Sequence, residues 1–528
     1  MLEYRNLDET ESFARLKKGK TIDLTQVLDP SRVEGYSIPD AFGLAFNYAA
    51  APVDEAVIER LSDLAAEQEL IPKYKALVKG EVMNTGEKRM VLHHLVRGQL
   101  SSDVIHEGKN LRSFYEEQRT RIAAFAEKVK AGTITGSTGK RFTTVVQIGI
   151  GGSDLGPRAL YLSLKDWVRE QNGKVDMEAR FISNVDPDDA NAVLSGIDFE
   201  RTLFILVTKS GTTQETLTNL AFVREKMKKA GIKGLDPSKH IIAVTSETSP
   251  LAGSKDYLDA FFIDDFIGGR YSATSAVGGV ILSLALGSDI FERILEGAHE
   301  ADRIALSGDI RKNPALMDAM IGVYERNVLG MPATAILPYS QALSRFPAHL
   351  QQLDMESNGK SVNRDGRPLS YPTGPVIFGE PGTNGQHSFY QLLHQGTDII
   401  PLQFIGFRKA QSSFDIDYEG SKSQTKLKAN LAAQIAAFAL GKSDSNPNKN
   451  FPGRRPSTLI HGESLTPEAL GALLSHYENK VMFQGFAWNI NSFDQEGVQL
   501  GKVLTQKILA KGADIDPVLE AYGRILGV

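Results

Sequence analysis

Short, uninterrupted apolar segments that each lead into a helical stretch occur in two separate regions of this chain. In the first region they include 142–150 (FTTVVQIGI), 201–208 (RTLFILVT) and 240–246 (HIIAVTS), and in the second they run from 333–339 (ATAILPY) to 457–463 (STLIHGE). Such segments are typical of strands in a parallel sheet that helices cover on both faces. Because the alternation occurs twice, the sequence predicts an α/β fold with two doubly wound parallel sheets.

The length of the chain, 528 residues, is too great for one ordinary hydrophobic core, so at least two domains are expected. An amphipathic helical pattern at 54–70 precedes the first sheet region, and helical sequence near 290–330 separates the two regions. We predict a first, smaller domain at 120–290. The second, larger domain would combine 1–119 with 291–528 and would carry the additional N- and C-terminal helices.

The composition excludes several classes of function. The net charge is −5, which argues against a broad nucleic-acid or anionic-membrane surface. The chain has no cysteine, so disulfides, thiol nucleophiles and cysteine-type zinc sites are excluded. The N-terminal sequence is charged and lacks the apolar core of a signal peptide, and no apolar run approaches the roughly 18 residues that span a bilayer. We expect a soluble, cytoplasmic protein that binds neither nucleic acid nor membranes.

The segment 208–216 (TKSGTTQET) follows a predicted buried strand and opens a predicted helix. Within six residues it supplies a cation, Lys209, a flexible Gly211 and four hydroxyls, which belong to Thr208, Ser210, Thr212 and Thr213. A phosphate dianion requires several short donors and positive charge at a helix start. An ordinary helix cap explains one or two of these hydroxyls but not four with a lysine. We therefore predict a phosphate site here.

A glycine-rich turn, 147–157 (QIGIGGSDLGP), also lies between a predicted strand and a predicted helix. Exposed backbone amides at such a turn suit an anion. The dinucleotide-binding pattern is only half met, because Gly149 and Gly151 fit but Asp154 stands where the third glycine belongs. Anion binding and a plain tight turn both remain open for this segment.

Two further segments carry charged residues suited to acid–base chemistry. Arg270 lies in a glycine- and serine-rich turn, 268–279, where it could stabilise a developing oxyanion or equally be a surface arginine at a bend. Asp354 and Glu356 are two residues apart at the end of a predicted helix, so they point to different faces and at most one is expected to enter a pocket.

Two of the ten histidines lie seven residues apart in 385–396 (GQHSFYQLLHQG). A metal-binding pair would prefer a spacing of four and a nearby carboxylate, so zinc is disfavoured. We interpret His394 as structural and His387, at the predicted helix start, as the better acid–base candidate. Gln495 and Lys502 are also seven apart, on one stripe of a predicted helix, where a lysine most often extends outward to solvent.

Five segments in this order resemble the glucose-6-phosphate isomerase family. They are QIGIGGSDLGP, GGRYSATSAVG, MESNGKS, GQHSFYQLLHQGT and FAWNINSFDQEGVQLGK, and they extend over 147–502, about two thirds of the chain. The resemblance implies two sugar-isomerase (SIS) domains, and a homodimer with its active site at the domain and subunit interface. It also implies an aldose–ketose isomerase of glycolysis and gluconeogenesis that interconverts glucose 6-phosphate and fructose 6-phosphate, with no metal and no cofactor.

The resemblance also implies a role for each matching residue. Glu356 would be the base that moves a proton between C2 and C1, and Arg270 would stabilise the enediol intermediate. His387 of the partner subunit and Lys502 would assist ring opening. The expected phosphate ligands are Thr208, Lys209, Ser210 and Thr213, and the expected lining of the sugar site is Gly152, Ser153 and Gln495. The family's phosphate loop commonly reads Ser-Lys-Thr-Phe-Thr-Thr, so Gly211 here replaces an aromatic residue.

Two alternatives are weighed against this reading. A related phosphosugar isomerase that also accepts mannose 6-phosphate would share the same motifs. A non-catalytic sugar-phosphate-binding regulator could keep the 208–216 loop, but it would have no need of Arg270, Glu356, His387 and Lys502 together.

Overall fold

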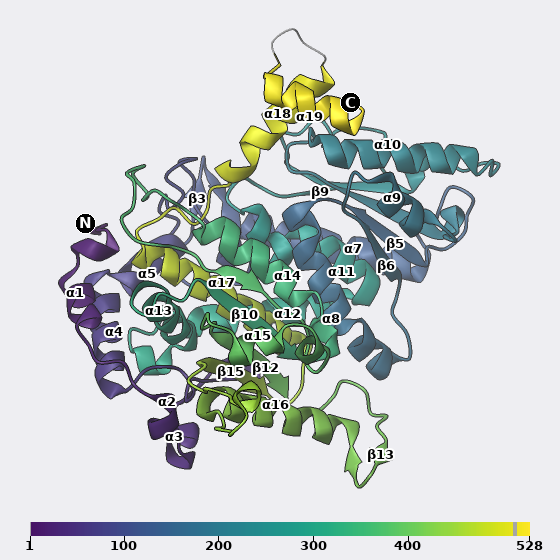
Figure 1. Ribbon diagram of the computed structural model, residues 1–528. Helices are drawn as coiled ribbons and strands as arrows, with labels where there is room; N and C mark the ends of the chain where they lie inside the picture. Colours follow the sequence, from purple (N-terminus) through teal and green to yellow (C-terminus); the bar gives the residue numbers. More distant parts are fainter. Residues whose placement is uncertain (1, 511–514) are drawn as a thin grey trace.

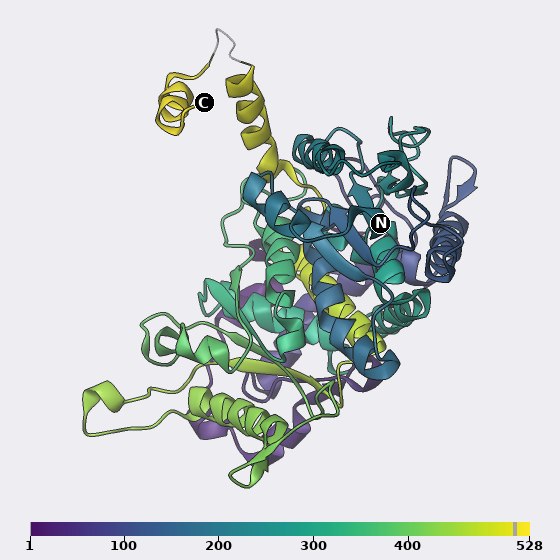
Figure 2. The same ribbon diagram turned by 90° about the vertical axis from the view of Figure 1, so that its right-hand side faces the viewer.

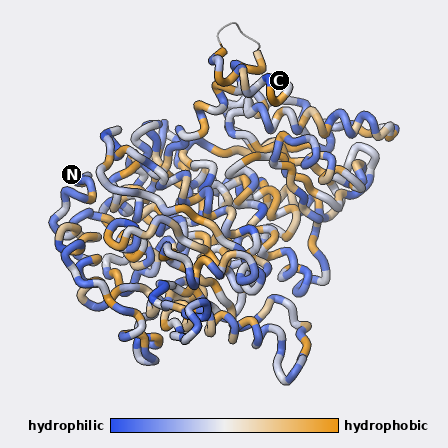
Figure 3. Tube along the Cα trace, viewed as in Figure 1, coloured by the Kyte–Doolittle hydropathy of each residue, from blue (hydrophilic) through white to orange (hydrophobic). Residues whose placement is uncertain are grey.

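A computed structural model describes residues 2–510 and 515–528 and contains two large, separate sheets (Figure 1). The first lies at the upper right of Figure 1, where β5, β6 and β9 are labelled, and the second lies below the centre, where β10, β12 and β15 are labelled. Figure 3 shows apolar residues concentrated along the inner elements and polar residues on the periphery. The expected α/β fold with parallel sheets is confirmed. The domain limits at residues 120 and 290 stay a prediction.

The first sheet is entirely parallel and has five strands in the order β6-β5-β7-β8-β9. Every residue of its central strand β7 is buried, as expected for a strand that is covered on both faces. The strands are β5 (Thr144–Ile148), β6 (Glu178–Ile182), β7 (Thr202–Val207), β8 (Ile241–Thr245) and β9 (Ala260–Phe262).

Alternate residues of these strands enter two different cores because side chains alternate across a sheet. Val146 and Phe204 pack with helices α9 and α10, whereas Val145 and Leu203 pack with α7, α8 and α11 on the opposite face. These helices are α7 (Leu111–Ala131), α8 (Leu155–Asn172), α9 (Pro187–Leu194), α10 (Gln214–Lys229) and α11 (Ala276–Leu286).

The second sheet has six strands in the order β1-β2-β15-β12-β10-β11. Four of them are parallel: β10 (Ala333–Tyr339), β11 (Val376–Phe378), β12 (Leu402–Phe407) and β15 (Ser457–Gly462). The N-terminal region adds an antiparallel edge, β1 (Ser37–Pro39) and β2 (Ala45–Asn47). The sequence pattern indicated mainly helix in this region. Strands of three residues are too short to show an alternating pattern.

Helices α15 and α16 cover one face of this sheet and α13, α14 and α17 the other. The remaining elements connect the sheets or lie at the surface.

Further helices belong to the second sheet region or to the connections. They are α1 (Glu11–Lys17), α2 (Leu24–Val27), α3 (Pro30–Gly35), α4 (Glu55–Glu67), α5 (Leu70–Val78), α6 (His93–Arg97), α12 (Ser288–Ile304), α13 (Pro314–Asn327), α14 (Phe346–Gln351), α15 (Tyr390–Gln395), α16 (Ser423–Leu440) and α17 (Pro467–Ala487). Two small hairpins are β3 (Ile105–His106) with β4 (Lys109–Asn110), and β13 (Asp417–Tyr418) with β14 (Ser421–Lys422).

The C-terminal helices α18 (Gln499–Leu509) and α19 (Pro517–Leu526) project from the body of the molecule, as Figure 2 shows most clearly. No residue of α18 is buried. Among the residues that the structure describes, no helix is long and apolar enough to span a membrane.

Helix α17 passes through the middle of the molecule, and all of its residues except Glu468 are buried. It lies against α12 with almost no space between the two backbones. A Cβ on Gly471 would clash with the carbonyl of Ile294, and a Cβ on Gly297 would clash with the carbonyl of Glu468. These two glycines therefore set how closely the two helices approach.

The substitution Gly471→Ala should destabilise the protein by about 3 kcal/mol, because a methyl group has no space at a backbone contact. Chemical denaturation measures this as a lower midpoint. The matched control is Gly501→Ala in α18, where the added Cβ meets open space. It should leave the midpoint unchanged or raise it slightly, since alanine favours a helix. Equal effects of the two changes would contradict this account of the α12–α17 contact.

Candidate active site

The first sheet reverses its strand order between β5 and β7, and the chain leaves the carboxyl ends of these two strands in opposite directions. Ligands in open α/β sheets bind at such a switch point. The loop after β5 contains the glycine-rich segment 149–153, and the loop after β7 contains 208–213. The predicted phosphate segment, and the glycine-rich turn for which anion binding was one of two alternatives, are therefore both at the position where this fold binds ligands.

Gly152 brings the glycine-rich loop into direct backbone contact with the segment that carries Arg270. A Cβ at Gly152 would overlap the carbonyl group of Gly269 and approach the amide nitrogen of Arg270 to 2.9 Å. The side chain of Gln147 holds the neighbouring Ser153 by donating a hydrogen bond to its backbone carbonyl (2.7 Å). Only glycine permits this approach, so two motifs more than a hundred residues apart in the sequence meet here.

Arg270 is buried, with only 2% of its surface exposed, so the alternative of a surface arginine is wrong. Its Nε donates to Ser357 Oγ (2.6 Å), and its Nη2 donates to the carbonyls of Ser492 (2.5 Å) and Asp494 (2.9 Å). Its Nη1 lies 3.5 Å from Glu356 Oε1. Three hydrogen bonds from Nε and Nη2 thus fix the guanidinium, and its third nitrogen, Nη1, faces the carboxylate of Glu356.

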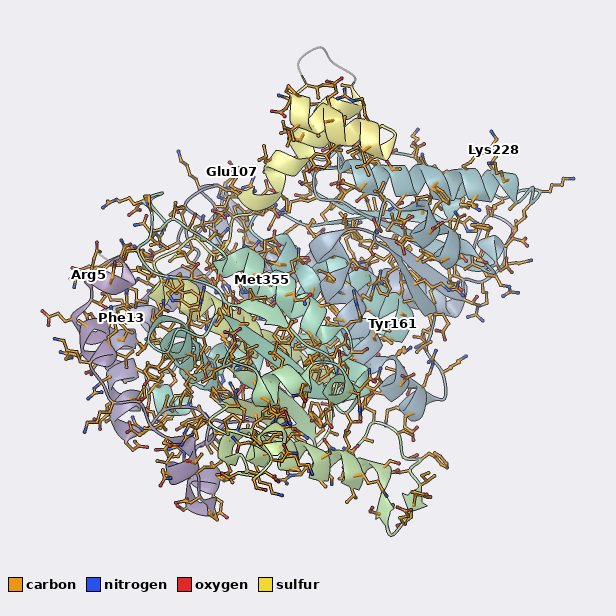
Figure 4. All side chains as sticks on the ribbon, in the orientation of Figure 1. Arg5, Phe13, Glu107, Tyr161, Lys228 and Met355 are labelled. Carbon is orange, nitrogen blue, oxygen red and sulfur yellow. The ribbon has the colours of Figure 1, made fainter. Side chains whose placement is uncertain are left out.

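Glu356 ends a π-helical turn, Gln352–Glu356, that follows α14. About a quarter of its side chain (23%) remains exposed, whereas Asp354 is buried. The two carboxyls therefore point in different directions, and Glu356 is the one that faces Arg270. Met355, between them, marks this turn in Figure 4. A partly exposed carboxylate beside a fixed guanidinium can exchange a proton with a bound molecule while the cation stabilises negative charge on its oxygens.

The hydroxyls of the 208–213 loop are paired with one another. Thr208 Oγ1 lies 3.0 Å from Thr213 Oγ1, and Ser210 Oγ lies 2.8 Å from Thr212 Oγ1. Helix α10 begins directly after the loop, and Thr213 makes no side-chain cap to it. The backbone amides at the start of α10 can therefore donate hydrogen bonds to a bound anion.

Lys209 connects this loop to the Arg270 segment. Its Nζ donates to the carbonyl of Ile267 (3.0 Å) and lies 3.8 Å from Asp265 Oδ1. Burial lowers the pKa of the Lys209 ammonium. The lysine therefore spans from the hydroxyl loop to the residues just before Gly268, and its charge is available close to the loop.

Gly211 has a backbone conformation that explains the absence of an aromatic residue. Its φ is +72°, in the left-handed region that favours glycine, and a Cβ there would clash with the Ser249 hydroxyl. Ser249 belongs to the loop after β8, so the two loops pack directly against each other at this glycine. In this chain the 208–213 loop is held by its neighbour rather than by an aromatic side chain.

Three predicted site residues are exposed, and none of them forms a side-chain hydrogen bond or ion pair with Glu356 or Arg270 among the described residues. His387 ends a short 3-10 helix and is exposed, and Lys502 is exposed on the projecting helix α18. Gln495 is also exposed, and its backbone (φ −144°, ψ 41°) is not helical. The prediction that Gln495 and Lys502 share one helical stripe is wrong, because α18 begins only at Gln499.

His394 has the structural role that its sequence context indicated. Its ring stacks on Phe438 at 3.7 Å, and its Nε2 lies 2.9 Å from Gln434 Oε1. No group of three or more metal-binding side chains occurs in residues 2–510 and 515–528. A cavity of about 590 Å³ lies between α3, β2 and α16, but none of the candidate site residues lines it.

Comparison with known proteins decides the family. The sequence profile described as phosphoglucose isomerase matches residues 47–519. The chain belongs to the phosphoglucose isomerase family. The resemblance inferred from the five motifs is confirmed.

Individual relatives extend the match over nearly the whole chain. Glucose-6-phosphate isomerase of Treponema denticola is 59% identical over 99% of this chain and 100% of its own length. That of Borreliella burgdorferi is 48% identical over 99% of both chains. The crystal structure of a glucose-6-phosphate isomerase from Chlamydia trachomatis, 42% identical, superposes with a TM-score of 0.91 over 99% of both chains.

The sequence analysis missed the residues that hold Arg270. Ser357 accepts from Arg270 Nε, and its hydroxyl also lies 3.0 Å from the Tyr271 hydroxyl. Lys360 forms an ion pair with Asp494, whose carbonyl accepts from Arg270. Both Ser357 and Lys360 lie in the MESNGKS motif, so the signal was present, but a small polar residue beside a carboxylate gives no indication of its partner.

Ser357→Ala should lower the kcat of the phosphoglucose isomerase reaction by at least about 10-fold, because a hydrogen bond to a charged group contributes roughly 1.5–3 kcal/mol. The matched control, Tyr271→Phe, removes the other hydroxyl at Ser357 and leaves the bond to Arg270 intact. It should change kcat by less than about 3-fold. Steady-state kinetics of both purified variants test this. The reverse order of effects would show that Arg270 does not depend on Ser357.

Proposed function

We propose that this chain interconverts glucose 6-phosphate and fructose 6-phosphate by carboxylate acid–base catalysis, without a metal or cofactor. Full-length identity of 46–59% to glucose-6-phosphate isomerases supports the reaction. The observation that carries the mechanism is the pairing of Glu356 with a buried Arg270, 3.5 Å apart. The segment before Arg270 is joined to the hydroxyl-rich loop by the hydrogen bond from Lys209 to the carbonyl of Ile267. The expected place of the reaction is glycolysis and gluconeogenesis in the cytoplasm.

The chemistry moves one proton between neighbouring carbons and one between their oxygens. In the open-chain sugar, Glu356 takes the proton from C2, the electron pair of that C–H bond forms the C1–C2 double bond, and the π pair of the C1 carbonyl moves to O1, which takes up a proton. The carboxyl then returns its proton to C1 while O2 loses its proton and forms the C2 carbonyl, which gives the ketose. Such a base contributes about 10²–10⁴-fold. Arg270, fixed by its three other hydrogen bonds, would stabilise the charge that develops on the two oxygens.

The phosphate would be bound away from the reacting carbons by Thr208, Lys209, Ser210 and Thr213. Its binding energy then orients C1 and C2 against Glu356, which is the main use of a remote anchor. The contact of Gly152 with Gly269 supports a role for 152–153 in lining the sugar site, since it places this loop beside Arg270. Gln495 is proposed as a further sugar contact from the family resemblance.

His387 and Lys502 are proposed to assist ring opening, with His387 supplied by a second copy of the chain. The exposure of His387 fits a residue that acts on a neighbouring subunit. A homodimer is also supported by large exposed apolar side chains on the projecting β13–β14 hairpin (labelled β13 in Figure 1) and just before it, namely Tyr418 in β13 and Phe414 and Ile416 ahead of it. The role of Lys502 rests on the resemblance.

The proposed reaction predicts isomerase activity that chelation does not alter. Purified protein should convert fructose 6-phosphate to glucose 6-phosphate in a coupled dehydrogenase assay, equally with and without EDTA. Glu356→Gln should lower kcat by at least about 10²-fold, because the amide cannot accept the proton. Mannose 6-phosphate in the same assay tests the alternative of a broader specificity. Loss of activity on chelation would overturn the metal-free mechanism, and a nearly active Glu356→Gln would overturn the choice of base.

A site shared between subunits predicts complementation. Glu356→Gln and His387→Ala should each be nearly inactive alone, but co-expressed they should recover about a quarter of wild-type activity, because one site in each mixed dimer combines an intact Glu356 with an intact His387. Co-expression of Glu356→Gln with Glu356→Ala is the control and should recover nothing. No recovery in the first pair would place His387 in its own subunit's site or outside the site altogether.

A further inference from the structure

The π-helical turn Gln352–Glu356 carries two carboxyls, those of Asp354 and Glu356, and directs them to opposite sides of the turn. Gln352 and Glu356 face the first sheet region: the Gln352 side chain lies against Gly151, and Glu356 faces Arg270. Leu353 and Asp354 are buried on the other side. Single π-turns inside helices are rare and occur frequently at functional sites. The direction of Glu356 therefore depends on what holds the buried side of the turn.

Behind the turn lies a small cavity of about 20 Å³. Asp354 lines it from the turn, Glu325 from α13, and Lys480 and Gln484 from α17. A volume of this size holds one water molecule if enough polar groups surround it. Four polar side chains from three elements meet that requirement.

Two buried oxygens at this cavity have no hydrogen-bond partner among the described residues: Asp354 Oδ1 and Gln484 Oε1. Both accept hydrogen bonds, and an unsatisfied buried acceptor costs roughly 1–3 kcal/mol. A water molecule donates two hydrogen bonds and can also accept from the Lys480 ammonium. One water in this cavity would therefore satisfy both acceptors and connect the π-turn to α17.

Neither carboxyl at the cavity forms an ion pair with any residue that the structure describes. The Lys480 Nζ already pairs with Asp318 Oδ1 (3.0 Å), and His476 lies between Asp318 (3.2 Å) and Asp40 (2.9 Å). Arg326, the other cation at the cavity, donates to the carbonyl of Thr373 (2.7 Å). Burial raises the pKa of Asp354 to about 7 and that of Glu325 to about 8. A water molecule in the cavity would therefore lower the free-energy cost of burying these carboxyls, because it supplies hydrogen bonds that a dry cavity lacks.

We propose that Asp354 is a positioning residue for Glu356: through one water in the cavity shared with Gln484 and Lys480, it holds the π-turn in the shape that directs Glu356 to Arg270. This inference rests on the proposed role of Glu356 as the base. Its consequence is kinetic. A loosened turn should misplace the base and lower kcat, while the phosphate loop and hence KM should change little, because 208–213 belongs to another segment.

The test compares Asp354→Ala with Asp354→Asn. The alanine leaves the water without its partner on the turn and should lower kcat at least about 10-fold with KM within about 2-fold. The asparagine has the same shape and keeps an oxygen that accepts from the water, so it should retain at least about a third of the wild-type kcat. The matched control is Glu325→Gln, which lines the same cavity from α13 and should leave kcat within about 2-fold.

A high-resolution crystal structure of the wild-type protein supplies a readout that does not depend on how the variants fold. It should show one ordered water within hydrogen-bond distance of Asp354 Oδ1 and Gln484 Oε1. A dry cavity would overturn the inference, and so would a folded Asp354→Ala enzyme with wild-type kcat, or equal losses in the alanine, asparagine and Glu325→Gln variants. An inactive wild-type protein would instead refute the proposed function, which keeps the two failures distinct.

Discussion

A buried guanidinium is the constraint around which the candidate site is built. Removing a charge from water is so costly that every donor of Arg270 needs a partner. The partners come from Ser357, Ser492 and Asp494, two segments that are far from residue 270 and from each other in the sequence. Satisfying this one side chain therefore joins the end of the first sheet region, the π-turn after α14 and the chain before α18. The carboxylate of Glu356 is placed by the same set of contacts.

Much of the fold could be predicted because its strands are short, apolar and regularly followed by helices. The predicted strands at 142–150, 201–208 and 333–339 correspond to β5, β7 and β10. The β1–β2 edge could not be predicted, because its strands have three residues each and gain their stability from pairing with β15. Tertiary context, not local pattern, makes those residues extended.

The candidate site was predictable to the extent that its residues lie in distinctive motifs. The hydroxyl loop and the glycine-rich turn were both visible, since each follows a strand. The burial of Arg270 was not, because a turn rich in glycine and serine is equally typical of a surface bend. The stripe predicted for Gln495 and Lys502 was wrong because Gln495 precedes a 3-10 turn, Glu496–Val498, and no local signal marks the later start of α18 at Gln499. The cavity beneath Asp354 is formed by the π-turn, α13, α17, β10 and β11 together, and no local sequence pattern indicates it.

The contact between Gly152 and Gly269 has a consequence for how such a site can change over time. The backbone of Gly269 occupies the volume that a side chain at position 152 would need, whereas a Cβ at position 269 would meet open space. A lineage in which position 152 acquired a side chain would have to move the 269–270 backbone in the same step, whereas position 269 could change without moving the glycine-rich loop. The glycine at position 152 is therefore tied to the backbone path at 269–270, although more than a hundred residues of chain separate the two segments.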